Sequence, residues 1–204
     1  MSDAHGSPGR LVLVRHGATA WSRSGRHTGR TDVPLLPEGE AAARSLAPVL
    51  ASVRFGLVLA SPLVRARQTA ALAGLTPEVD ADLVEWDYGA FEGLTSAQIR
   101  HDRPGWTVFD GEVRGGETLA ELAERARRVL SRVGPILAGE DVALVGHGHA
   151  LRVLACVYLG LDPRHGAALF LDPGSVSVLR RDHDVPAVAL WNWRPGMPLA
   201  DESR

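Results

Sequence analysis

Two short apolar runs that lie far apart in the sequence end in the same way, and this constrains the fold more than any other feature. Residues 11–14 lead directly into Arg15-His16-Gly17, and residues 142–145 lead into Gly146-His147-Gly148. A continuous run of aliphatic residues is typical of a strand that is buried on both faces of a parallel sheet. The polar residues that follow must leave the core, so the sequence predicts two buried strands that each deliver a histidine to an end of the sheet.

The rest of the chain alternates between strand-like and helix-like patterns. Further runs predict strands at residues 57–60, 175–179 and 187–191. Helical periodicity predicts helices at residues 38–51 after Pro37, 63–73 after Pro62, 117–137 and 149–159. This alternation predicts an α/β fold of three layers, in which a mainly parallel sheet is covered by helices on both faces. In such sheets ligands bind beyond the carboxyl ends of the strands, so the polar residues there are the candidates for function.

Length and composition favour one globular domain over residues 1–204, with loose termini at 1–9 and 195–204. The chain has 204 residues, of which 45% are hydrophobic and 23% charged, close to the averages for globular proteins. No segment approaches the roughly 18 continuous apolar residues that a membrane span needs, so no membrane partner is expected. Residues 105–116 are rich in glycine and charge and lack periodicity, which predicts a loop over the functional site.

Charge and cysteine content give no sign of a macromolecular partner. The net charge is −2, and no clustered basic face of the kind that binds nucleic acid is visible. The short basic runs are interpreted as solvated faces; they are Arg125, Arg127 and Arg128, and Arg180 and Arg181. The single cysteine, Cys156, lies in an apolar stretch and cannot form an internal disulfide, which favours a buried thiol and a reducing, cytoplasmic compartment.

The two strand ends carry groups that suit a phosphate. Arg15 can bind phosphate oxygens in a fork, and a neutral imidazole nitrogen of His16 is a competent nucleophile toward phosphorus. The second strand end adds His147 and His149, whose spacing also occurs in zinc sites. No carboxylate follows where a hydrolytic metal site would need one, so the sequence favours an anion site without a metal ion.

Two further segments add a cation and a set of carboxylates. Arg65 lies in the first turn of the helix after Pro62, where the helix dipole disfavours a cation, so an anion that it helps to hold explains it better than a surface position. Glu85, Asp87 and Glu92 alternate with aromatic residues, and one of them could act as a general acid and base. The pattern alone does not select one of the three.

In their order, and over most of the chain, these segments resemble the histidine phosphatase superfamily, also called phosphoglycerate-mutase-like. The matching residues are 13–17, 26–29 with Asp32 and 34–35, 61–63 with 65–66 and 68–69, Glu85 with 88–89 and 92–93, 116–118, and 146–148. With Trp21-Ser22, Trp106 and 147–152, they are similar to the branch that contains bacterial acid phosphatases and fungal sugar-bisphosphatases. The resemblance implies a metal-independent phosphomonoesterase that needs no cofactor and acts on a small phosphorylated metabolite, a sugar phosphate or bisphosphate.

The resemblance also implies roles for single residues. His16 is similar to the family's phosphorylated nucleophile and Glu85 to its proton donor. The rest of the phosphate pocket corresponds to Arg15, Arg65 and His147. His147 is expected to act protonated, which together with a protonated Glu85 predicts an acidic pH optimum. Contacts on the substrate side are implied for Thr28 and Gly29. The candidates for binding substrate or phosphate also include Ser22, Gly148 and His149, of which His149 lies at a position where other members of the family vary. At Ser22 the family often has asparagine, and the shorter hydroxyl offers one donor.

Two other functions remain open at this point. The first is mutase activity, although the stretch between Glu85 and His147 lacks the long insertion of true phosphoglycerate mutases, so water should reach the phosphoenzyme and favour hydrolysis. The second is a non-catalytic module that binds a phosphorylated ligand, which would usually lack the nucleophile or the acid. The sequence leaves the oligomeric state open, a homodimer included.

Overall fold

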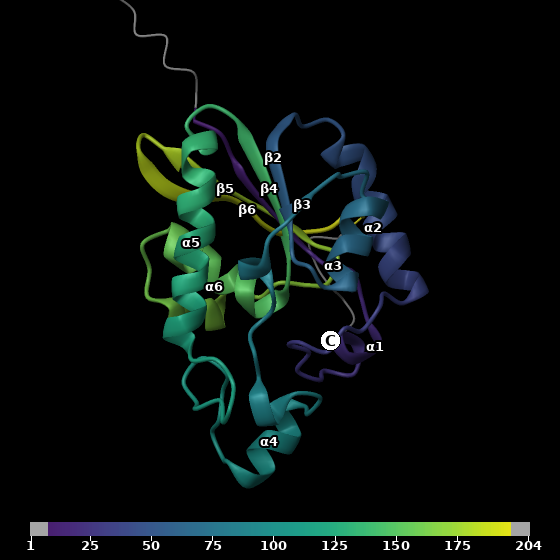
Figure 1. Ribbon diagram of the computed structural model, residues 1–204, viewed down its shortest axis with the longest axis vertical. Helices are drawn as coiled ribbons and strands as arrows, with labels where there is room; N and C mark the ends of the chain where they lie inside the picture. Colours follow the sequence, from purple (N-terminus) through teal and green to yellow (C-terminus); the bar gives the residue numbers. More distant parts are fainter. Residues whose placement is uncertain (1–7, 197–204) are drawn as a thin grey trace, which may run out of the picture.

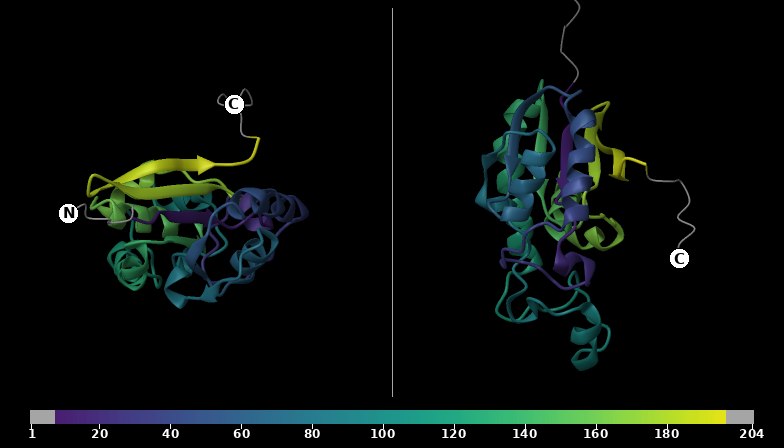
Figure 2. Two further views of the ribbon diagram at one scale, coloured as in Figure 1. Left: turned by 90° about the horizontal axis from the view of Figure 1, so that it is seen from above. Right: turned by 90° about the vertical axis from the view of Figure 1, so that its right-hand side faces the viewer.

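Six strands form the centre of the molecule in the order β3-β2-β4-β1-β5-β6 (Figure 1). The protein is seen in a computed structural model that describes residues 8–196. The strands are β1 (Leu11–Arg15), β2 (Phe55–Ala60), β3 (Glu78–Val79), β4 (Asp141–Gly146), β5 (Val176–Asp182) and β6 (Val185–Trp193). The first four run parallel to one another, and the β5–β6 hairpin continues the sheet antiparallel to β1 (Figure 2). The predicted α/β fold with a mainly parallel sheet is confirmed.

Helices cover both faces of this sheet, as predicted. α2 (Pro37–Leu50) and α3 (Val64–Leu72) pack on one face, and α5 (Leu119–Leu137) and α6 (Gly148–Tyr158) pack on the other (Figure 1). The shorter helices are α1 (Ala20–Arg23), α4 (Ser96–Asp102) and the 3-10 helices η1 (Ala81–Leu83), η2 (Gly89–Phe91) and η3 (Pro163–Ala168). Within residues 8–196, no helix combines the length and the apolar character needed to cross a membrane.

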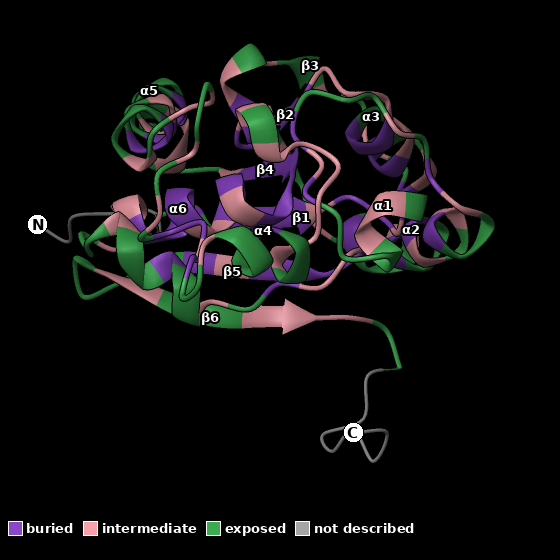
Figure 3. Ribbon diagram, turned by 90° about the horizontal axis from the view of Figure 1, so that it is seen from below, coloured by how far each residue is buried: buried purple, intermediate pink, exposed green. Residues whose placement is uncertain are grey.

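The side chains of β1 show why its sequence is apolar throughout. Leu11 and Leu13 are fully buried against α5 and α6, whereas Val12 and Val14 face α2 and α3. Successive side chains of a strand point to opposite faces, so a strand with helices on both sides needs an apolar residue at every position. Burial of each such side chain contributes about 1.5–3 kcal/mol. Figure 3 shows the contrast with the edge of the sheet, where β6 is largely exposed or half-buried.

Local hydrogen bonds set the start of several helices. α2 begins at Pro37, whose missing N–H is not needed in a first turn. α5 begins after Thr118, whose hydroxyl accepts from the backbone N–H of Glu121 while the Glu121 carboxylate accepts from the backbone N–H of Thr118. Capping boxes of the same kind begin α1 after Thr19 and α4 after Thr95. The sequence prediction lacks these two short helices and the two-residue strand β3, because such elements carry too little periodicity to be recognised.

The loose termini expected at 1–9 and 195–204 fall mostly outside the described residues. Residues 1–7 and 197–204 lie outside them altogether. Gly9 is buried, and its N–H donates to the carbonyl oxygen of Leu137 at 2.9 Å. Gly9, which the sequence analysis assigned to the loose N-terminal tail, therefore packs against the end of α5.

Candidate active site

Parallel pairing of β1 with β4 brings the two predicted histidines together. Arg15 pairs with Gly146 in the register of the strands, so the residues that follow, His16 and His147, lie at the same edge of the sheet. The centroids of the two imidazole rings are 5.1 Å apart, and the exposed fractions are 4% for His16 and 0% for His147. The inference from the two similar strand ends is confirmed, because the fold delivers both histidines to one place.

A single hydrogen bond fixes the tautomer of His16. Its Nδ1 lies 2.7 Å from the carbonyl oxygen of Gly17, and since a carbonyl oxygen can only accept, Nδ1 carries the proton. Nε2 then keeps its lone pair, as a nucleophile requires. Burial lowers the pKa of His16 well below its usual value, and the charges of Arg15 and Arg65 lower it further. The imidazole is therefore neutral at neutral pH.

The turn that carries His16 is held against α2 and α3. The backbone N–H of Gly17 donates to the hydroxyl of Thr69 at 3.0 Å, and this hydroxyl donates to the carbonyl oxygen of Arg65 at 2.7 Å. A Cβ on Gly17 would lie 2.3 Å from the carbonyl oxygen of Gly39, so the chain passes α2 too closely for any side chain at this position. The turn can therefore place the imidazole of His16 only with glycine next to it.

His147 and Arg65 lie buried beside His16 and do not line the pocket. Arg65 Nε donates to His147 Nδ1 at 3.1 Å, so this nitrogen is unprotonated, and His147 Nε2 lies 2.7 Å from the hydroxyl of Ser61. Burial lowers the pKa of His147 well below its usual value, and Arg65 and His16 lower it further. The prediction that His147 acts protonated is wrong for this structure, in which the imidazole is neutral. The expectation of an acidic pH optimum then depends on Glu85.

Arg65 also holds the loop 28–31 in place. Its guanidinium donates to the carbonyl oxygens of Thr28, Gly29 and Thr31 at 2.9–3.1 Å. Gly29 is buried and its N–H donates to the carboxylate of Glu92 at 2.9 Å, so the structure places this predicted contact residue in the scaffold and not at the pocket wall. Thr28 does line the pocket, and its hydroxyl donates to the carbonyl oxygen of Arg26 at 3.2 Å.

The structure separates the three carboxylates among which the sequence did not select. Glu92 accepts hydrogen bonds from the backbone N–H groups of the loop 29–31. Asp87 pairs with Arg30 at 2.6 Å. Neither lines the pocket, whereas Glu85 does. The candidate for acid–base chemistry is therefore Glu85.

Glu85 is held at the start of α6. The residue is 5% exposed, and its carboxylate accepts from the backbone N–H groups of Trp86, His149 and Ala150 at 2.8–3.1 Å. The last two N–H groups belong to the first turn of α6, where backbone donors are not used within the helix. Main-chain donors thus fix both oxygens of the carboxylate at the pocket.

Arg15 offers a cation with an unused donor. Its Nη1 donates to the carbonyl oxygen of Leu171. Its guanidinium lies over Gly148, where an added Cβ would be 3.1 Å from Arg15 Cζ. Arg15 Nε is buried and has no hydrogen-bond partner among residues 8–196. An unpaired buried N–H is costly, and a phosphate oxygen would supply the missing acceptor.

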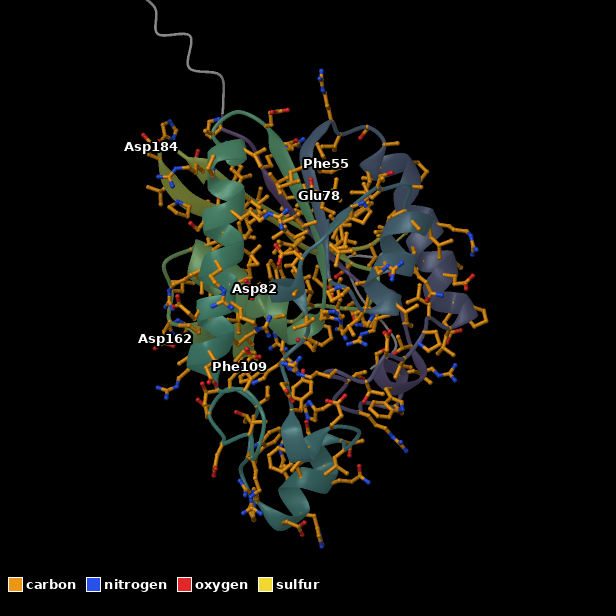
Figure 4. All side chains as sticks on the ribbon, in the orientation of Figure 1. Phe55, Glu78, Asp82, Phe109, Asp162 and Asp184 are labelled. Atoms are coloured by element: carbon orange, nitrogen blue, oxygen red, sulfur yellow. The ribbon has the colours of Figure 1, made fainter. Side chains whose placement is uncertain are left out.

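These groups meet in a pocket of about 410 Å³ at the carboxyl edge of the sheet. Arg15, His16 and Glu85 contribute to its lining, as do Val108 and Phe109 of the loop 105–116, which has neither helix nor strand. This loop therefore lies at the site, as predicted, and its Phe109 is labelled in Figure 4. Of the other predicted contact residues, the pocket is lined by Ser22, Thr28, Gly148 and His149. The sequence missed three arginines that also line it: Arg26, Arg100 and Arg152. Glu85 is the one carboxylate in this described lining, so the pocket suits an anionic ligand.

Ser22 has a structural task that limits its contact with a phosphate. Its hydroxyl donates to the carbonyl oxygen of Thr19 at 3.1 Å and accepts from the backbone N–H of Thr19 at 2.8 Å. A hydroxyl has one proton to donate. Ser22 therefore cannot donate to a phosphate oxygen without giving up its hydrogen bond to the carbonyl oxygen of Thr19.

His149 is held by an aromatic cluster that the sequence did not identify. The hydroxyl of Tyr88 lies 2.5 Å from His149 Nδ1, and burial raises the pKa of Tyr88 well above its usual value, so this contact is made by a neutral phenol. The rings of Phe109 and His27 pack against His149 with centroid distances of 5.4 and 6.0 Å. Tyr88 and His27 both lie in segments that match the family, and this was the available signal.

The two histidines whose spacing also occurs in zinc sites, His147 and His149, have separate partners in the structure. His147 contacts Arg65 and Ser61, whereas His149 contacts Tyr88. Over residues 8–196, no group of three or more His, Cys, Asp or Glu side chains is arranged to hold a metal ion. The side chains of His147 and His149 therefore contact different residues and do not converge on one point.

Comparisons with known proteins agree on one family. The model of the histidine phosphatase superfamily, branch 1, matches residues 11–194. An acid phosphatase of Mycobacterium tuberculosis is 37% identical over 184 residues, which cover 89% of this chain and 91% of that protein. The sedoheptulose 1,7-bisphosphatase of Saccharomyces cerevisiae is 33% identical over 218 residues, which cover 91% of this chain and 80% of that protein. The solved structure of an open reading frame product of Mycobacterium tuberculosis has a TM-score of 0.88 at 35% identity and covers 91% of this chain and 98% of its own.

Proposed function

The chain belongs to branch 1 of the histidine phosphatase superfamily and is a phosphatase, and from this premise we propose that it hydrolyses sugar-sized phosphate monoesters through a phosphohistidine at His16. The observation that carries the proposal is the state of His16, a neutral imidazole whose Nδ1 is bound to Gly17 and whose Nε2 is left to act at a pocket lined by Arg15 and Glu85. A neutral imidazole can attack phosphorus without a metal ion.

In the first step, the Nε2 lone pair of His16 attacks the phosphorus atom, and the P–O bond to the alcohol breaks. Glu85 in its protonated form gives its proton to the leaving oxygen, so the alcohol departs neutral. Arg15 donates to the phosphoryl oxygens, over which the charge of the transition state is spread. The proton that Glu85 needs can arrive with the substrate, because the second pKa of a phosphate monoester is about 6.

In the second step, a water molecule attacks the phosphorus atom of the phosphohistidine. Glu85, now ionised, accepts the proton of this water. The P–N bond breaks, its electron pair returns to Nε2 of His16, and inorganic phosphate leaves. Positioned acid–base groups of this kind contribute about 10²–10⁴-fold to a rate.

The size and charge of the pocket support small sugar phosphates and bisphosphates as substrates. A volume of about 410 Å³ accommodates a small metabolite. The arginines that the phosphoryl transfer does not need, Arg26, Arg100 and Arg152, are available to further anionic or hydroxyl groups of the substrate. One relative of the chain is a sedoheptulose 1,7-bisphosphatase, which is consistent with this class.

We also propose that the chain works as one globular unit in the cytoplasm. Cys156 is fully buried, and burial raises the pKa of its thiol to about 11, so the thiol is unreactive at neutral pH. A free buried thiol suits a reducing compartment. Fractionation of cells that express the full chain tests the location, and a purely extracytoplasmic protein would contradict it.

The test of the reaction is phosphate release in the presence of EDTA, measured with wild type and His16→Ala. The panel contains sugar phosphates, sugar bisphosphates, phosphoglycerates and an aryl phosphate. We expect metal-free hydrolysis that His16→Ala reduces by about 10⁴-fold or more. His183→Ala, which removes a 96% exposed imidazole from the β5–β6 turn, is the control and should match wild type. An alkaline quench followed by peptide mass spectrometry should locate one phosphoryl group on His16.

Other outcomes favour the alternatives. Interconversion of phosphoglycerates without net hydrolysis would establish a mutase. Phosphate binding without turnover would establish a binding module. Hydrolysis that survives His16→Ala would place the nucleophile elsewhere and overturn the proposal.

A further inference from the structure

Arg125 of α5 is a buried cation at the back of the segment that carries Glu85. The side chain is 12% exposed, although the sequence suggested a solvated face. Its Nη1 donates to the carbonyl oxygens of Asp82 and Val84 at 2.6 and 3.1 Å, and its Nη2 donates to that of Glu85 at 3.4 Å. These bonds tie α5 to the backbone of residues 82–85.

Glu117 completes the arrangement. Its two carboxylate oxygens accept from Nε and Nη2 of Arg125 at 2.6 and 2.7 Å. With the three carbonyl contacts, this accounts for all five N–H donors of the guanidinium. The main chain of Glu117 also binds the same segment, since its carbonyl oxygen accepts from Trp86 Nε1 at 2.7 Å and its N–H donates to the carbonyl oxygen of Asp87 at 2.9 Å.

Glu85 therefore lies between two sets of contacts. On the pocket side, the N–H groups of His149 and Ala150 hold its carboxylate. On the other side, Arg125 and Glu117 hold its main chain and that of its neighbours, and Glu117 also holds the side chain of Trp86. A general acid must reach the leaving oxygen within hydrogen-bond distance, and a displacement of about 1 Å can cost about 10²-fold in rate.

We propose that Arg125 and Glu117 are a positioning pair for the proton transfer of Glu85. This rests on the proposed function, in which Glu85 protonates the leaving group. The pair does not line the pocket, so we expect it to touch neither the phosphate nor the leaving group of a bound substrate. Its loss should impair the step that needs the proton and spare the steps that do not.

A neighbouring ion pair provides a matched control. Arg128, on the same helix, binds the carboxylate of Asp82 through two hydrogen bonds of 2.7 and 2.8 Å. The side chain of Arg128 is 52% exposed, and within residues 8–196 it donates to no main-chain carbonyl oxygen of the segment 82–85. Asp82 is labelled beside α5 in Figure 4. Arg128→Ala thus removes a surface pair from the same segment, and such pairs contribute little.

The experiment compares phenyl phosphate with 4-nitrophenyl phosphate, because the two differ little in shape but the phenolate of the first is the more basic leaving group. We measure kcat/KM for both esters with wild type, Arg125→Ala, Arg125→Lys, Glu117→Gln, Arg128→Ala and Glu85→Gln. Arg125→Ala and Glu117→Gln should lower the value for phenyl phosphate about tenfold and leave that for 4-nitrophenyl phosphate within about twofold of wild type. Arg125→Lys, with three donors for five acceptors, should fall between, and Arg128→Ala should match wild type.

Thermal unfolding of every variant keeps folding separate from positioning. Should Arg125→Ala fail to fold, Arg125→Lys and Glu117→Gln carry the same test. A loss for both esters by the same factor would mean a merely structural pair and would overturn the proposal, as would wild-type values for both.

A double substitution distinguishes failure of this inference from failure of the proposed function. Glu85→Gln should lower kcat/KM for phenyl phosphate by about 10²-fold or more, and adding Arg125→Ala should then change it less than about twofold, because the two act on one proton transfer. If Glu85→Gln itself lowers kcat/KM for both esters by the same factor, the assigned role of Glu85 is wrong. If Glu85→Gln behaves as expected and the effect of Arg125→Ala is fully additive, only the positioning pair is wrong.

Discussion

The two ends of the sheet carry arginines in opposite states. At the carboxyl edge, Arg65 is buried and Arg15 is half-buried, and their hydrogen-bond partners within residues 8–196 are main-chain carbonyl oxygens and a neutral imidazole. At the amino edge, arginines are exposed and lie within 2.6–3.9 Å of carboxylates; the pairs are Arg10 with Asp141, Arg180 with Asp182, and Arg181 with Asp184. Figure 4 shows Asp184 and Phe55 near the upper end of the molecule and Phe109 in its lower half, above the segment that contains α4. Carboxylates thus contact the arginines at the amino edge, whereas Arg15 and Arg65 at the carboxyl edge have no carboxylate in direct contact among the described residues.

The difference in arginine partners identifies the functional end of the sheet better than the volumes of the two cavities do. The groove at the amino edge has a volume of about 950 Å³, against about 410 Å³ for the pocket that contains His16. Its cations already have anionic neighbours, so little positive charge is left for a ligand. A buried cation without a carboxylate costs several kcal/mol in desolvation. Such a cost is retained where a ligand supplies the missing negative charge, as a phosphate dianion would between Arg15 and His16.

Arg10 and Arg15 provide the largest test of this comparison, because they flank the same short strand. Arg10 directly precedes β1 and is paired with Asp141, whereas Arg15 ends it without a carboxylate partner among the described residues. Arg15→Ala should lower kcat/KM for phosphate monoesters by about 10³-fold, since it removes a preorganised donor to the transition state. Arg10→Ala should stay within about twofold, because it removes an exposed ion pair.

Equal losses for the two variants would break the comparison. Inorganic phosphate offers a second readout that does not depend on turnover. It should raise the unfolding temperature of wild type and of Arg10→Ala, because a ligand that binds the native state stabilises it, and should have little effect on Arg15→Ala.

The next largest effect concerns stability at acidic pH, which should depend on the carboxyl edge. Burial lowers the pKa of His27 from 6.5 to about 4. The unfolded chain therefore binds a proton more readily than the native protein. The contribution of His27 to the free energy of unfolding is fully present above pH 6.5 and is lost as the pH falls toward about 4. This loss amounts to about 3 kcal/mol for His27 alone. His27→Asn should flatten the fall in the free energy of unfolding, measured by urea titration at several pH values across this window.

The control for this prediction lies at the other end of the sheet. His183→Asn removes an imidazole from the exposed β5–β6 turn and should keep the wild-type profile. If His27→Asn also keeps the wild-type profile, the buried imidazole of His27 does not contribute to the acid sensitivity of the fold.

The carboxyl edge could be predicted from the sequence because its signals are local. The run before His16 and the run before His147 are apolar at every position, so two buried strands with polar ends followed directly. Which of Glu85, Asp87 and Glu92 is the candidate for acid–base chemistry could not be predicted from such local signals. It depends on the N–H groups of α6, which lie far away in the sequence and approach Glu85 only when the chain is folded.

The buried position of Arg125 could have been predicted from helical periodicity, but its basic neighbours favoured a solvated face. Arg125 lies three residues after Leu122 and four before Val129, both of which are buried, so helical periodicity places it on the inner face of α5. Its two basic neighbours suggested a solvated run instead. The prediction of a protonated His147 was wrong for a different reason. The protonation state of this imidazole is set by a hydrogen bond from Arg65, which a sequence does not reveal. Periodicity predicts which face a residue occupies but not which partner it meets there.

The smallest effect separates the position of the Arg15 charge from its presence. In Gly148→Ala, the new Cβ would lie 3.1 Å from Arg15 Cζ, so the guanidinium must move by a few tenths of an ångström while its charge is kept. We expect kcat/KM to fall about tenfold, since small displacements of a positioned group are costly. Gly134→Ala in α5 is the matched control, because its Cβ would meet nothing within 4 Å beyond its own helix and chain neighbours, and it should keep full activity. Full activity of Gly148→Ala would mean that charge alone, without a fixed position, distinguishes the carboxyl edge from the amino edge.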